Sequence, residues 1–171
     1  MNKNSLILLL ITILSFACEK DDICPEATAT TPQLIVRFYD AVTSENLKSV
    51  SGLFVYGIND NSETVFFKSM SIKTTDSIAL TLRTDSNITK FVFHKDLVET
   101  SDLLVGNPDT VDVNYIKDNI YVSRACGYKA TFTNLGATPL ADADNWISSI
   151  NIIAENNTIN NENAAHINIY H

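Results

Sequence analysis

The chain has 171 residues, of which 45% are hydrophobic, and its formal net charge is −8. That length corresponds to about one domain, and the apolar share allows a buried core, which excludes wholesale disorder. The acidic balance excludes nucleic acid as a partner and disfavours direct adsorption on anionic lipid, because both need a basic surface.

The N-terminal segment has the features of a lipoprotein signal peptide. An apolar run over residues 6–16 has the length of a signal-peptide core and is too short to span a bilayer. Ala17 then places a small residue before Cys18, as lipoprotein signal peptidase requires, although Ser15 stands where that site commonly has leucine. We therefore predict a signal peptide over residues 1–17 and a lipid on Cys18 as the membrane anchor. An ordinary secretory signal is the alternative.

The residues after Cys18 predict where the protein is delivered. Lys20, Asp21 and Asp22 resemble the export signal that sends Bacteroidota lipoproteins to the outer face of the outer membrane. We therefore expect an outer-membrane protein displayed on the cell surface. If these residues are only a solvated tether, the protein stays on the periplasmic leaflet.

Two cysteines remain, Cys24 and Cys126. An exported protein folds in an oxidising compartment, and a single pair permits a single bond, so we predict a disulfide between them. Two free buried thiols are an alternative. A nucleophilic Cys126 is another, although no His or Asn lies close to it in the sequence.

Residues 33–171 are predicted to form a single β domain, preceded by a lipidated tether and linker over residues 18–32. Short segments rich in Val, Ile, Thr, Phe and Tyr follow one another, mostly with the alternation of a half-buried strand. They cover residues 34–39, 53–56, 65–72, 78–83, 91–93, 111–116, 120–125, 128–133, 147–153 and 165–170. About ten short strands indicate an all-β, two-sheet sandwich, immunoglobulin-like or transthyretin-like, with a closed β-barrel as the alternative. Lys117-Asp118-Asn119 is predicted as a tight hairpin turn.

Several side chains could carry recognition, but each also has an ordinary structural role. Trp146 with Tyr121 or Tyr128 could stack on a sugar, although packing in the core is the favoured role. Arg83 and Arg124 could bind a carboxylate, although pairing with a neighbouring acid, or snorkelling at the sheet edge, is favoured.

No motif indicates catalysis, a cofactor or a metal, and we predict none of them. The segment Asp142-Ala143-Asp144-Asn145 could offer oxygens to calcium, but it lacks the spacing of a calcium loop and is better explained as a polar turn.

Two short motifs resemble the O-glycan acceptor site of exported Bacteroidota proteins. They are Asp76-Ser77-Ile78 and Asp109-Thr110-Val111, and both fall at the start of a predicted strand, where turns are accessible. Ser77 and Thr110 are therefore candidate glycosylation sites.

Several segments together resemble a family of uncharacterised Bacteroidota lipoproteins that is classed only as a domain of unknown function. They are CEKDDICP at 18–25, FYD at 38–40, LTLRTD at 80–85, YVSRACGY at 121–128, DNWI at 144–147 and AAHINIYH at 164–171. The resemblance spans nearly the whole chain after the signal peptide. It implies a lipoprotein in which Cys24 pairs with Cys126, and it implies no activity, substrate or catalytic residue.

We therefore expect a non-enzymatic binding or structural module of the cell envelope. Its membrane contact would be the N-terminal lipid, and its partner another envelope protein or a glycan. The alternative is an envelope hydrolase whose site is assembled from distant carboxylates and arginines.

Overall fold

The computed structural model describes residues 23–26, 28, 30–59, 61, 63–65, 71–100 and 103–171. The predicted signal peptide, Cys18 and the Lys20-Asp21-Asp22 signal lie outside these residues. In the described part of the chain the elements are strands, with one short 3-10 helix and no α-helix. They are β1 (Leu34–Tyr39), β2 (Val50–Ile58), β3 (Thr64–Val65), β4 (Lys73–Thr75), β5 (Ser77–Leu80), β6 (Ile88–Thr100), β7 (Leu103–Ser123), β8 (Gly127–Pro139), β9 (Ser149–Ile152), η2 (Ala154–Asn156) and β10 (Ile167–Tyr170).

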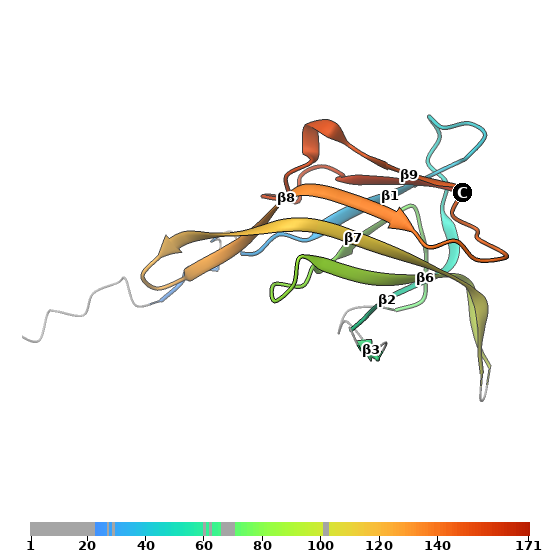
Figure 1. The fold of residues 1–171 in the computed structure, drawn as a ribbon, viewed down its shortest axis with the longest axis horizontal. Coiled ribbons are helices and arrows are strands. Elements are labelled where there is room, and N and C mark those ends of the chain that lie inside the picture. Colours follow the sequence, from blue (N-terminus) through green and yellow to red (C-terminus); the bar gives the residue numbers. More distant parts are fainter. Residues whose placement is uncertain are drawn as a thin grey trace, which may run out of the picture.

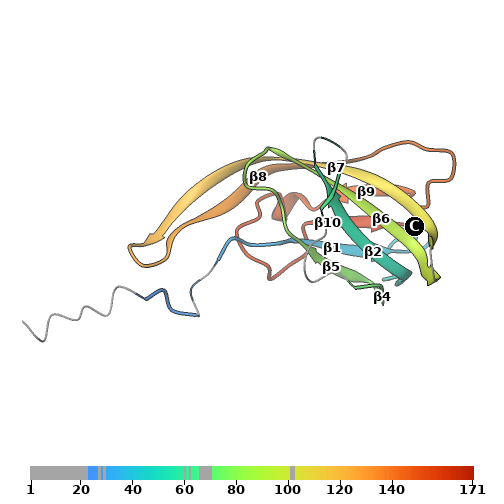
Figure 2. The same cartoon turned by 90° about the horizontal axis from the view of Figure 1, so that it is seen from below.

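The strands form two sheets (Figures 1 and 2). The first sheet has the order β5-β1-β10-β9, and the second has the order β3-β2-β6-β7-β8 with β4 paired to β2. β1 lies parallel to β10, whereas its other neighbour, β5, is antiparallel. The prediction of an all-β, two-sheet sandwich is therefore confirmed.

The core fills the space between the two sheets. Strand alternation explains its composition, because every second residue of β1, namely Leu34, Val36 and Phe38, is buried. The second sheet contributes Phe91 and Phe93 from β6, and both aromatic rings are fully buried or nearly so. Phe38 meets Phe93 edge-on, with ring centroids 6.4 Å apart, so the two sheets contact each other through aromatic side chains.

The prediction that all strands are short is wrong for three of them. β6 and β8 have 13 residues each, and β7 has 21. The predicted turn at Lys117-Asp118-Asn119 is also wrong, because these residues lie inside β7 and pair with Phe132, Thr131 and Ala130 of β8. The turn comes later, at residues 124–126. Lys117 donates to the carbonyl oxygen of Thr84, and Asp118 and Asn119 are exposed, so the run is polar because this part of the strand faces solvent.

β7 is long enough to belong to two projecting hairpins. β6 pairs with β7 only as far as Asn114, so residues 116–133 of β7 and β8 continue as a two-stranded ribbon, called here the β7–β8 arm. Figures 1 and 2 show this arm extending past the rest of the molecule, beside the N-terminal segment. At the other end of β7, Val98 pairs with Val105 beyond the reach of β8, in what is called here the β6–β7 ribbon.

Candidate functional site

The β7–β8 arm exposes large apolar and aromatic side chains. Tyr121 and Tyr128 are paired across the two strands, their ring centroids are 5.4 Å apart, and they are 58% and 70% exposed. Ile116 and Ile120 are exposed as well. Because side chains alternate along a strand, the two isoleucines lie on the face opposite to Tyr121. The arm therefore presents apolar surface on both of its faces.

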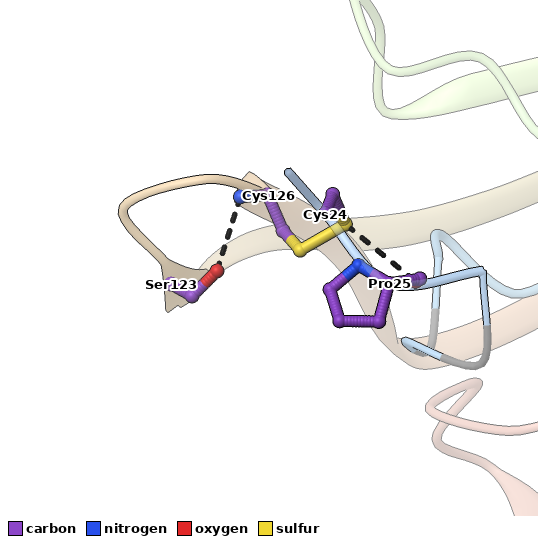
Figure 3. Close-up of a disulfide and its surroundings, with 4 residues drawn as sticks. All are labelled: Cys24, Pro25, Ser123 and Cys126. Atoms are coloured by element: carbon purple, nitrogen blue, oxygen red, sulfur yellow. Dashed lines mark hydrogen bonds between the residues drawn. A yellow bond between two sulfur atoms is a disulfide. The ribbon is translucent and has the colours of Figure 1, made fainter. Parts of the chain in front are cut away.

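A disulfide fastens the tip of the arm to the N-terminal tether. Cys24 and Cys126 are bonded, with Cα atoms 4.8 Å apart, and Figure 3 shows the bond beside the hairpin turn. Ser123 closes that turn, since its Oγ accepts a hydrogen bond from the backbone N–H of Cys126 at 3.0 Å. The predicted disulfide is confirmed. The alternatives of free thiols and of a nucleophilic Cys126 are wrong, because neither cysteine keeps a thiol.

The outer edge of β8 is covered by segments from both ends of the described chain. Thr31 of the tether accepts a hydrogen bond at its Oγ1 from the backbone N–H of Ala130 at 3.0 Å. Further along, Phe132 and Ile159 exchange two backbone hydrogen bonds of 2.7 and 3.1 Å. An open strand edge would attract other chains, and these contacts occupy the part of the edge next to the sandwich.

The β6–β7 ribbon carries a second exposed apolar pair. Val98 and Val105 face each other across the two strands and are 57% and 51% exposed, while Leu97 next to them is buried. β7 runs from this ribbon into the β7–β8 arm, so the two apolar sites lie at opposite ends of one strand.

Trp146 is separated from the two tyrosines with which sequence analysis grouped it. Its indole is buried in the core, and its Nε1–H donates to the carbonyl oxygen of Phe93 at 3.2 Å. The predicted core role of Trp146 is therefore confirmed. Core packing is wrong for Tyr121 and Tyr128, which are exposed.

The two arginines have different surroundings. Arg83 binds Asp85 through its Nε and one terminal nitrogen, each 3.0 Å from a carboxylate oxygen. Hydrogen bonds from this guanidinium lower the pKa of Asp85. Arg83 is thus paired with a neighbouring acid, as predicted. Arg124 lies exposed at the turn of the β7–β8 arm, three residues after Tyr121.

The loop at residues 142–145 binds its own backbone. The Asn145 side chain accepts a hydrogen bond from the backbone N–H of Asp142 at 2.8 Å and donates to the carbonyl oxygen of Leu140 at 3.1 Å. Nearby, the buried carboxylate of Asp109 accepts from the backbone N–H of Ile147 at 2.8 Å, and burial raises the pKa of Asp109. These contacts make the segment a polar turn, as predicted. Within the described ranges, no three His, Cys, Asp or Glu side chains are grouped to hold a metal.

The two candidate glycosylation residues differ in their setting. Ser77 begins β5 and is half-buried, with its Oγ donating to the carbonyl oxygen of Val36 at 3.2 Å. Thr110 was expected at the start of a strand, and that position is wrong. It lies in the middle of β7, paired with Val92, and follows the buried Asp109. Modification of either residue stays a prediction.

A cavity of about 280 Å³ lies beside β4 and β5. It is lined by Gln33, Leu53, Ser71, Lys73, Thr75, Ser77, Ile78 and Ala79. Glycoside hydrolysis commonly uses two carboxylates, and this lining contains none. Among the described residues, no helix has the length and apolar content to cross a membrane.

Sequence reasoning missed the exposed apolar residues of the β7–β8 arm and the exposed pair Val98 and Val105 on the β6–β7 ribbon. In the sequence, Ile116 ends the predicted strand at 111–116 on the polar side of its alternation, and Ile120 begins the predicted strand at 120–125, so neither is marked as part of an exposed apolar ribbon. Only the strand pairing shows that β6 ends opposite Asn114, so these residues lie on a two-stranded ribbon whose base, at Ala130 and Phe132, is still buried. Comparison with protein families adds one finding. The model described as a family of unknown function (DUF6452) matches residues 52–171, more than two thirds of the chain.

The chain belongs to this family, DUF6452. The DUF6452 match begins within β2, so it includes Cys126 and leaves out Cys24 and the tether. It is therefore shorter than the resemblance noted from the sequence, and it assigns no activity. Comparisons with curated proteins and with solved structures find no match.

Proposed function

We propose that this chain is a lipid-anchored outer-membrane protein of Bacteroidota, and that its β domain is a non-enzymatic module that binds another protein of the cell envelope. The observation that carries the proposal is the arrangement of the two hairpins along β7. One hairpin is fastened to the tether through Cys126, and the other carries the exposed Val98 and Val105.

The disulfide supports the envelope location. Disulfides persist in oxidising compartments and are rare in the cytosol. The Cys24–Cys126 bond spans 102 positions, so it joins two segments that are far apart in the sequence. Together with the apolar run that ends at Cys18, this bond favours export followed by lipid attachment.

The β6–β7 ribbon supports a protein partner. Val98 and Val105 side chains offer aliphatic surface without hydrogen-bonding groups, which suits an apolar protein surface better than a sugar. The ribbon projects at the end of β7 that lies away from the tether, so a partner could approach it without displacing the anchor. Contiguous exposed apolar surface marks interaction sites in many soluble proteins, and Val98 and Val105 are adjacent to each other across the two strands.

Recovery of a partner from the native envelope tests the binding role. The full-length protein is cross-linked in cells, isolated in mild detergent and compared with the Val98→Asp/Val105→Asp double variant. We expect the double variant to lose most of the cross-linked partner. Ser149→Asp, at an exposed polar site on β9, is the control and should keep it. Equal recovery with all three proteins would contradict the proposed surface.

A further inference from the structure

We propose that the tip of the β7–β8 arm lies in the headgroup layer of the membrane that holds the Cys18 lipid. In this position the apolar side chains of the tip contact the lipid–water interface. The inference rests on the lipid anchoring in the proposed function, and it goes beyond that function by assigning a second, protein-borne membrane contact.

Chain length limits how far the tip can be from the anchor. Cys24 follows Cys18 by six residues, which span at most about 20 Å when fully extended. The Cα of Cys126 is 4.8 Å from that of Cys24, so the turn of the arm stays within roughly 25 Å of the lipidated residue. A domain on a free linker has no such restriction, because its position relative to the membrane is set by the linker alone.

The side chains at the tip suit the interface. Tyrosine has an apolar ring and a polar hydroxyl, and it is enriched where hydrocarbon meets water. Tyr121 and Tyr128 are both mainly exposed. Ile120, which precedes Tyr121, is exposed as well, and so is Ile23, which precedes Cys24 on the other side of the disulfide. Arg124 at the turn is exposed and can extend its guanidinium to lipid phosphates while its stem stays among apolar groups.

The exposure of both faces favours a fluid layer over a protein partner. A protein that docks on a ribbon covers one face, yet the isoleucines and Tyr121 lie on opposite faces of the arm. A headgroup layer surrounds an inserted tip and covers both. The total charge of the chain is acidic, but the exposed side chains nearest the turn are Ile120, Tyr121, Arg124 and Tyr128, while the exposed Asp118 and Asn119 lie further from it.

Fluorescence quenching in vesicles tests the proposal. The lipidated full-length protein is reconstituted in phosphatidylethanolamine–phosphatidylglycerol vesicles containing lipids that are brominated near the headgroup. Tyr121→Trp places a reporter on the arm, and Val98→Trp places a matched one on the β6–β7 ribbon. Trp146 is present in both proteins and is buried, so the wild type gives the background emission.

We expect the added emission of Tyr121→Trp to fall by at least half in brominated vesicles and that of Val98→Trp to stay unchanged. Adding Cys24→Ser/Cys126→Ser to Tyr121→Trp should abolish most of the quenching, because the tip is then no longer held near the anchor. Vesicle-bound protein with an unquenched Tyr121→Trp would overturn the proposal, as would equal quenching at both reporters. A Cys18→Ala protein that floats with vesicles like the wild type would instead overturn the lipid anchor, so the two failures are distinguishable.

Discussion

Position 52 needs a residue without a Cβ. Gly52 lies in β2 with a φ of +54°, and a Cβ added there would lie 2.7 Å from the backbone nitrogen of Leu97. The close approach lets β2 pass against the irregular segment of β6 where Asp96 also has a positive φ. Both the conformation and the space therefore require glycine.

Gly52→Ala should lower the free energy of unfolding by roughly 1–3 kcal/mol, the usual magnitude for a side chain forced into this backbone region. Gly136→Ala is the matched control, because the nearest atom to its added Cβ would be the Cβ of Asn114 at 4.0 Å. We expect the control to change stability by no more than about 0.5 kcal/mol in urea titrations. Equal losses in the two variants would contradict the steric explanation.

His166 makes the fold sensitive to acid. Its Nδ1 accepts a hydrogen bond from the backbone N–H of Ile35 at 3.0 Å, which requires an unprotonated nitrogen. Burial lowers the pKa of His166, and burial also lowers the pKa values of His94 and His171. The unfolded chain therefore binds protons first as the pH falls below the ordinary histidine value of 6.5. Stability is present above that value and declines from it toward the lower, folded-state pKa.

We expect the free energy of unfolding to be smaller at about pH 5.5 than at about pH 7.5. His166→Asn keeps an acceptor near the position of Nδ1 and does not titrate, so it should reduce this difference. The measurement is a pair of urea titrations for each protein. An unchanged pH dependence in the variant would assign the effect to other groups.

The β7–β8 arm is an element that needs help to be stable. An isolated two-stranded hairpin is marginal in water, and β6 gives no support beyond Asn114. The disulfide at the tip and the hydrogen bond from Ala130 to Thr31 supply what a third strand supplies elsewhere. The bond therefore both stabilises the arm and restrains the tether.

Replacing both Cys24 and Cys126 with Ser should lower the free energy of unfolding by roughly 2–4 kcal/mol, since it removes a cross-link that restricts the unfolded chain. Thermal unfolding followed by the far-ultraviolet β signal measures the effect. The wild type in reductant serves as the control, and its melting temperature should fall to that of the variant. A melting temperature that neither treatment changes would mean that the bond contributes nothing to stability.

The elements show where sequence reasoning succeeds and where it fails. β1 was predicted with its observed bounds, because its alternating residues pack against the core on one side. β7 was divided in two, because Lys117-Asp118-Asn119 has the composition of a turn while the backbone continues as a strand. A run of polar residues occurs both in turns and in strands that face solvent, so composition alone does not distinguish the two. Exposure on the arm depends on where β6 ends, and no local pattern records that.

The disulfide was predictable for a different reason. Cys24 and Cys126 were paired from the chemistry of the compartment and from the small number of cysteines, without any knowledge of strand order. The exposed pair Val98 and Val105 was missed because neither residue lies in a predicted strand: the predicted segments end at Phe93 and resume at Val111, whereas β6 and β7 continue through both valines.

At the scale of the whole molecule, the anchor decides where the domain acts. Cys18→Ala should abolish membrane association, because the apolar run that ends at Ala17-Cys18 predicts that a lipid on Cys18 is the anchor. Cell fractionation with a high-salt wash measures it. A variant that stays in the membrane fraction after the wash would contradict the lipid anchor.

Surface display is a separate prediction that depends on Lys20-Asp21-Asp22. An amine-reactive reagent that cannot cross membranes should label the wild type on intact cells, since Lys73 is exposed. Replacing the three residues with Ala should protect the protein until the cells are opened. Labelling of both forms would remove the role of the signal, and protection of both would place the protein on the periplasmic leaflet.

The Cys24–Cys126 bond also closes a covalent ring that contains β1 to β7. The exposed loop at residues 41–47 lies within this ring, so a single proteolytic cut there leaves both fragments joined. A cut in the exposed loop at residues 140–145 lies outside the ring, and the fragment that carries β9 and β10 is then held by non-covalent contacts alone, such as the pairing of β10 with β1. A nicked molecule of the first kind keeps its full mass in a gel without reductant and separates into two pieces only when the sulfurs are reduced.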